Sequence, residues 1–145
     1  MQSISPEKLC NEVERLLAVH PIVYIPTRGN SMVPFIKGES DMVLVKKPKG
    51  KYQKGMIVLA RTLDRRVVLH RVVSIGHEYL DLMGDGNLVG KERCRRSDVV
   101  AVADSLLAQN GEHIELYGNK QMWEWRLWYW MRPFRRILLK LWDLR

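Results

Sequence analysis

Apolar residues near the N-terminus recur with the period of a helix. The repeating positions fall at i, i+4, i+7 and i+8, and they are Leu9, Val13, Leu16 and Leu17. Ser5 is suited to the N-cap of such a helix, and Pro6 to its first position. The pattern predicts an amphipathic helix over residues 5–19, which ends near His20-Pro21 because the residue before a proline disfavours helix.

The pattern then changes to short apolar runs rich in β-branched residues, with Gly, Pro and Asp between them. The runs predicted as strands cover residues 22–25, 42–45, 56–60, 67–75, 79–83, 99–102 and 112–117. Short strands separated by turns indicate a compact, curved antiparallel sheet or a small barrel. We therefore expect a mainly β (α+β) fold, with a single domain over residues 1–118 and its β-core at 22–117.

Residues 119–145 form a tail of a different kind. They combine all five tryptophans with several arginines and lysines, and Pro133 divides them. The second part, 134–145, is predicted to be a basic helix with an apolar face. Two interpretations stay open: the tail folds back on the barrel or pairs with another copy, or it lies on an anionic membrane surface, which we favour slightly.

Composition narrows the class of protein. The chain has 145 residues, no visible repeat and a net charge of +8, so we expect one domain with an anionic partner. The basic run at Lys46–Lys54 is not accompanied by a recognised nucleic-acid module, so we do not expect nucleic-acid binding. We also see no signal-peptide pattern and no stretch near the ~20 apolar residues that span a bilayer.

The cysteines and histidines give no pattern typical of a metal site. Cys10 and Cys94 have no metal-ligand spacing, and free thiols in a reducing compartment are the simplest interpretation. His77 and His113 have no partner at ligand spacing and are interpreted as structural or exposed. We therefore expect no metal, no cofactor and a cytoplasmic protein, with a peripheral position at the inner membrane surface if the tail binds lipid.

The candidate chemistry begins at residues 29–34, Gly-Asn-Ser-Met-Val-Pro. Gly29 permits a tight turn, and Pro34 restricts the path that leaves it, so the turn would present the Ser31 hydroxyl. A serine hydroxyl is a weak nucleophile without a base. His70 can serve as that base near neutral pH, and in a strand it would share a face with Val68 and Val72.

This turn resembles the G-x-S-M-x-P nucleophile box of the superfamily that contains signal peptidase I and the LexA-type self-cleaving repressors. Four further blocks follow in that superfamily's order, at residues 38–45 (similar to G-D-x-V-L-V), 55–59 (G-D-I-V), 68–73 (H-R-V-V) and 84–87 (G-D-N-N). The resemblance runs from about Gly29 to Ala103. Because His70 stands where other branches have lysine, the match is to the serine–histidine branch of the endoplasmic-reticulum and archaeal type.

The resemblance implies a serine endopeptidase with a compact β-fold. Ser31 would be the nucleophile and His70 the base, with Gly29, Asn30 and Met32 forming the surrounding binding turn. Asp85 is the favoured orienting acid and Glu92 is the alternative, because the further aspartate that follows the G-D-N-N block in the family is missing here. The oxyanion would be bound by a backbone N–H of the turn.

The expected substrate is a peptide bond of another protein. LexA-type proteins cut themselves at Ala-Gly or Cys-Gly, and neither dipeptide occurs in this sequence. The alternative is a non-catalytic module that keeps the fold and binds a membrane surface or a peptide. Met56, at a position where the family usually has an acid, favours that alternative, whereas the intact Ser31 and His70 favour the enzyme. The sequence does not fix an oligomeric state.

Overall fold

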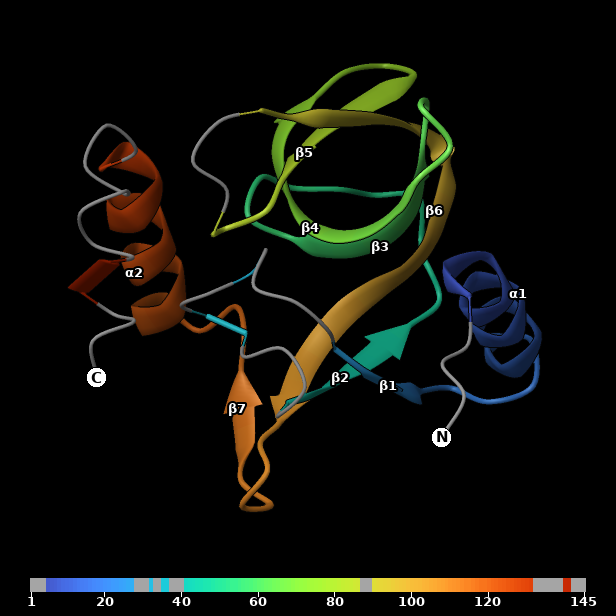
Figure 1. Ribbon diagram of the computed structural model, residues 1–145, viewed down its shortest axis with the longest axis horizontal. Helices are drawn as coiled ribbons and strands as arrows, with labels where there is room; N and C mark the ends of the chain where they lie inside the picture. The colour runs from blue at the N-terminus through green and yellow to red at the C-terminus, as the bar shows by residue number, and fades with distance from the viewer. Residues whose placement is uncertain are drawn as a thin grey trace.

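The computed structural model describes residues 5–27, 32, 35–36, 41–86, 90–131 and 140–141. The elements in chain order are α1 (Pro6–Leu17), β1 (Val23–Pro26), β2 (Met42–Lys46), β3 (Ile57–Thr62), β4 (Val67–Ile75), β5 (Tyr79–Met83), β6 (Glu92–Leu107), β7 (His113–Glu115) and α2 (Asn119–Trp130). In Figure 1 the two helices lie on opposite sides of the β-structure. The expected mainly β architecture is confirmed.

Four strands close into a small antiparallel barrel. β3 pairs with β4, β4 with β5, β5 with β6, and β6 returns to β3. β6 is 16 residues long, and beyond the barrel it pairs with β2 and β7. Figure 1 shows this strand leaving the barrel and running down to β2 and β7, so one strand joins both parts of the sheet.

Two strands agree with the sequence prediction at both ends, and a third begins earlier than predicted. β4 and β5 have the bounds that the sequence predicts, whereas β6 begins at Glu92, well before the predicted start at residue 99. Its first residues alternate, with Glu92 and Cys94 buried and Arg93 and Arg95 exposed. This period of two is that of a strand with one face in the core, although the outward residues are all charged.

Helix α1 follows its sequence signals closely. The Ser5 side chain accepts a hydrogen bond from the Lys8 backbone N–H (3.3 Å), and Pro6 occupies the first turn. The helix ends at Leu17, before His20-Pro21. Its buried residues are Cys10, Val13 and Leu17, and they pack in a core with residues of β1, β2, β3 and β6. Each such side chain contributes about 1.5–3 kcal/mol by leaving water.

Helix α2 packs on the outside of the barrel. Trp125 is buried in a cluster with Val73 of β4 and Met83 of β5. The first part of the tail therefore folds back on the β-structure. The predicted helix at 134–145 lies outside the described residues except for Lys140 and Leu141, which are helical. None of the described helices has the length and apolar character needed to cross a bilayer.

Candidate active site

His70 lies inside the small barrel. It pairs with Val58 of β3, and Val68 and Val72, two residues away on either side, belong to the barrel core. Because side chains alternate along a strand, His70 shares their inward face, as the sequence predicts. The residue is 5% exposed. The His70 imidazole is therefore shielded from water.

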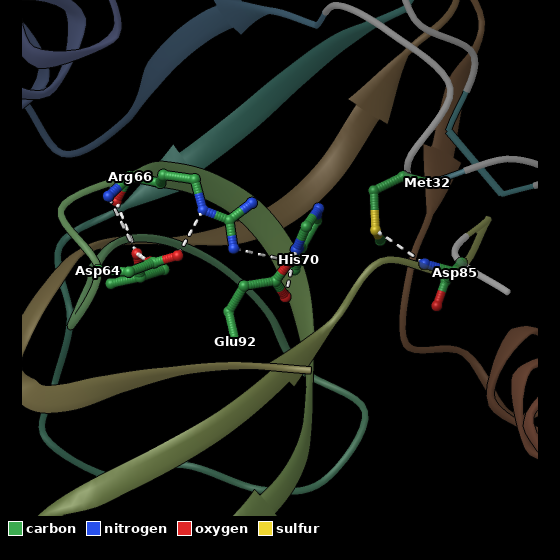
Figure 2. A network of polar contacts seen from close by, with 7 residues as sticks. Met32, Asp64, Arg66, His70, Asp85 and Glu92 are labelled. Atoms are coloured by element: carbon green, nitrogen blue, oxygen red, sulfur yellow. Dashed lines mark hydrogen bonds and ion pairs between the residues drawn. The ribbon is translucent and has the colours of Figure 1, made fainter. Parts of the chain in front are cut away.

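A carboxylate holds one nitrogen of this imidazole. His70 Nδ1 lies 3.1 Å from Oε2 of Glu92, which is buried at the start of β6. An ionised carboxylate can only accept a hydrogen bond, so the contact places a proton on Nδ1, and in the neutral imidazole the lone pair is then on Nε2. Figure 2 shows the second ring nitrogen pointing away from Glu92. Among the described residues, no hydrogen-bond partner of Nε2 is found.

A cation lies beside the other oxygen of Glu92. Arg66, in the turn before β4, places its guanidinium 3.7 Å from Glu92 Oε1. Nε of the same guanidinium donates to Asp64 (2.8 Å), whose carboxylate also accepts from Thr62. Figure 2 shows the order Asp64, Arg66, Glu92, His70 across the mouth of the barrel. Nothing in the local sequence marks Arg66 as a neighbour of Glu92, and the contact is visible only in the structure.

Asp85 does not contact His70; its partner is Arg71. The Arg71 guanidinium donates to both oxygens of the Asp85 carboxylate at 2.7–3.1 Å, and also to the Gly55 carbonyl oxygen (2.9 Å). Arg71 follows His70 in β4 and therefore faces the outside of the barrel. This corrects the expected contact: the carboxylate at the imidazole belongs to Glu92, the alternative, because Asp85 lies on the other side of the β4 strand.

Asp85 connects three segments through its own groups. Its backbone N–H donates to the Met32 sulfur (3.4 Å), and its carbonyl oxygen accepts from the Trp128 indole of α2 (2.5 Å). Its carboxylate binds Arg71 of β4. The turn around Met32, the barrel and helix α2 are thus tied together at one residue.

Met32 is an anchor of the turn that carries the candidate nucleophile. Its side chain is buried in the core, and its carbonyl oxygen accepts from the N–H groups of Phe35 (3.0 Å) and Ile36 (2.9 Å). The Met32 side chain is therefore part of the core, and its expected place in the binding turn stays a prediction. The other five residues of this turn, at positions 29–31, 33 and 34, lie outside the described residues, and Gly29, Asn30 and Ser31 are among them.

The thiols and carboxylates of the described residues do not gather into a metal site. No group of three or more His, Cys, Asp or Glu side chains in that part of the chain is arranged to hold an ion. Cys10 and Cys94 are free and buried, and burial raises the pKa of each thiol to about 11. Neither thiol is therefore poised as a nucleophile near neutral pH.

The sequence was compared with protein families and with curated proteins. No protein-family model matches the chain, and no curated protein matches it significantly. The likeness to serine peptidases therefore rests on the sequence blocks around Ser31 and His70, and on the buried imidazole–carboxylate pair.

Proposed function

We propose that this protein is a serine endopeptidase that cuts a peptide bond of another protein. Ser31 is the nucleophile, His70 the general base and then the general acid, and Glu92 the residue that orients the imidazole. The observation that carries the proposal is the 3.1 Å contact between His70 Nδ1 and Glu92. It supports the tautomer that a base needs, with the proton on Nδ1 and the lone pair on Nε2.

The proposed reaction uses these groups in two halves. As Ser31 Oγ attacks the substrate carbonyl carbon, Nε2 of His70 takes the hydroxyl proton, and Glu92 stabilises the resulting imidazolium. The same nitrogen then gives its proton to the leaving amine, so that the C–N bond breaks and an ester to Ser31 remains. Water, deprotonated by His70, hydrolyses this ester. A backbone N–H of the Ser31 turn would bind the oxyanion.

Asp85 has a positioning role in this proposal. Ser31 precedes Met32 in the chain, and Met32 is held by the backbone N–H of Asp85. The Asp85 carboxylate is fixed by Arg71, the neighbour of His70. This network supports a turn held at a set place relative to the base, which is what proximity of nucleophile and base requires.

The second candidate is a non-catalytic module that keeps the fold. The observation in its favour is the near-complete burial of both His70 and Glu92, since a paired, buried histidine is also a common structural element. The free and buried cysteines support a reducing compartment such as the cytoplasm for either candidate.

A fluorophosphonate probe separates the two candidates, because it reacts with an activated serine. The intact protein should be labelled, Ser31→Ala should not, and His70→Gln should be labelled far more slowly. Ser97→Ala is the matched control, because Ser97 is an exposed serine of β6 and its loss should leave labelling unchanged. Equal labelling of Ser31→Ala, or no labelling of the folded wild type, would overturn the peptidase proposal.

A further inference from the structure

Helix α2 has apolar side chains on two opposite faces. The inner face packs on the barrel through Trp125, which is buried, and Trp128, which donates to the Asp85 carbonyl oxygen. The outer face carries Trp123, Leu127 and Trp130, which are 68%, 57% and 81% exposed. These three residues are spaced i, i+4 and i+7, so they form one continuous stripe. We call this stripe the outer face of α2.

Such a helix is normally buried on both sides, because exposing large apolar side chains to water is unfavourable. The barrel covers one side only. Trp and Leu make up the stripe, and Arg126 lies beside it with its guanidinium 5.8 Å from the ring centre of Trp123. An outer face of tryptophan with a flanking cation has the composition of a membrane–water interface, where an amphipathic ring meets both water and hydrocarbon.

The charge of the segment that contains α2 favours an anionic surface over a second copy of the chain as the partner of the outer face. Residues 119–145 contain seven lysines or arginines but only two acidic residues, Glu124 and Asp143, and thus provide five of the eight net positive charges of the chain. A symmetric dimer through the outer face of α2 would bring two copies of this basic segment together, and their like charges would repel. An anionic surface is attracted instead, by about 1 kcal/mol for each basic residue near it.

We propose that the outer face of α2 docks on an anionic lipid bilayer. The tryptophans enter the headgroup region, and Lys120 and Arg126 of α2 meet the lipid phosphates. The helix lies along the surface, because its inner face remains bound to the barrel through Trp125 and Trp128.

This orientation determines how far the candidate active site lies from the membrane surface. A helix with its side chains is about 10–12 Å across. The Asp85 loop contacts the inner side of α2, so it lies about one helix diameter above the headgroups. On the proposed peptidase function, the preferred substrates are then proteins that present a segment at the membrane surface. The docking itself does not depend on catalysis and is measured without it.

Vesicle sedimentation of the full chain tests the docking. The protein should sediment with vesicles of phosphatidylcholine mixed with phosphatidylglycerol, and much less with phosphatidylcholine alone. Added salt should weaken the binding. Trp123→Ser/Trp130→Ser should lower partitioning at least about tenfold, because two large rings no longer leave water. Arg126→Gln should lower it about fivefold, which corresponds to about 1 kcal/mol.

The matched control changes exposed apolar residues away from α2. Val19→Ser/Leu63→Ser removes two such side chains, one directly after α1 and one in the turn after β3, and should leave partitioning unchanged. Equal binding of the tryptophan variant and the wild type would overturn the proposal. So would a concentration-dependent dimer, seen by analytical ultracentrifugation, that dissociates in Trp123→Ser/Trp130→Ser while no form of the protein binds vesicles. Fluorophosphonate labelling in solution tests the peptidase proposal independently of membrane docking.

Discussion

The two faces of strand β4 each carry a buried contact between a basic side chain and a carboxylate, and the two contacts have different properties. On the inner face His70 contacts Glu92, and on the outer face the next residue, Arg71, contacts Asp85. All three nitrogens of the Arg71 guanidinium donate hydrogen bonds, to both Asp85 oxygens and to the Gly55 carbonyl oxygen, and the ring centres of Phe35 and Trp125 each lie 5.3 Å from its Cζ. His70 uses Nδ1 only, as far as the described residues show.

This difference distinguishes a buried basic side chain that holds the structure together from one that can take part in a reaction. A guanidinium stays protonated and, when fully bound, can only hold segments together. An imidazole with one nitrogen fixed and one lone pair kept can accept and return a proton. Removal of the outer pair should therefore cost stability, whereas removal of the inner pair should cost activity.

The largest expected effect is on activity at the inner pair. His70→Gln should lower kcat/KM by about 10⁴-fold, because loss of one member disables a catalytic unit. The glutamine amide can still donate to Glu92, so the thermal midpoint should stay near that of the wild type. A peptide substrate that the wild type cleaves provides the measurement.

Val68→Ala is the control for this variant, because Val68 faces the same core. It should lose stability through a small cavity and keep its turnover. Wild-type turnover should also fall on acidification, because a protonated imidazole cannot accept the serine proton. Near-wild-type turnover by His70→Gln would show that another group is the base.

The next largest effect is on stability at the outer pair. Asp85→Asn leaves the Arg71 guanidinium, which is 1% exposed, without its anion. The free energy of unfolding should fall by about 3–5 kcal/mol, measured by urea titration. Glu92→Gln should cost much less stability, since the glutamine carbonyl oxygen can still accept a hydrogen bond from His70 Nδ1, but should lower kcat/KM strongly.

Asp81→Asn is the control for an exposed pair, because Asp81 binds Arg93 at the surface. Its cost should be within about 1 kcal/mol. If Asp85→Asn unfolds at the same urea concentration as the wild type, the Arg71–Asp85 pair does not hold the loop. If Asp85→Asn loses turnover at full stability while Glu92→Gln keeps it, the roles of the two acids are reversed.

The smallest expected effect concerns the access of water to the interior of the barrel. Cys94 lies two residues after Glu92 on the inward side of β6, and burial raises the pKa of its thiol from 9.0 to about 11. The reactive thiolate is thus about a hundredfold scarcer at neutral pH than for a cysteine with the ordinary value. A thiol reagent should react slowly with the native protein and rapidly in urea. Rapid reaction of Cys94 in the native state would show that water enters the barrel.

Much of the local structure could be predicted from the sequence. Helix α1 followed from Ser5, Pro6 and the apolar spacing, and strands β4 and β5 from their β-branched and alternating residues. The inward direction of His70 followed from its neighbours in β4. These features depend on residues within one or two turns of each other, so the sequence pattern contains them.

The identity of the orienting acid was decided only by the tertiary structure. Asp85 and Glu92 both follow β5, and nothing local distinguishes them as partners of His70. The choice depends on register: Glu92 pairs with Leu82, so its side chain enters the barrel, while Asp85 lies where Arg71 reaches it on the outside. Register between strands is fixed by the packing of the whole barrel, and a shift of one residue would reverse every side chain of β6.

The position of α2 was decided in the same way. Its tryptophans are present in the sequence, but apolar residues on every side of a helix do not show which side a protein core will cover. That was settled by Trp125 packing against Val73 and Met83, and by the bond from Trp128 to Asp85. Periodicity within a segment thus determined the elements and their inward faces. Contacts between distant segments determined which carboxylate meets the imidazole and which face of α2 the barrel leaves uncovered.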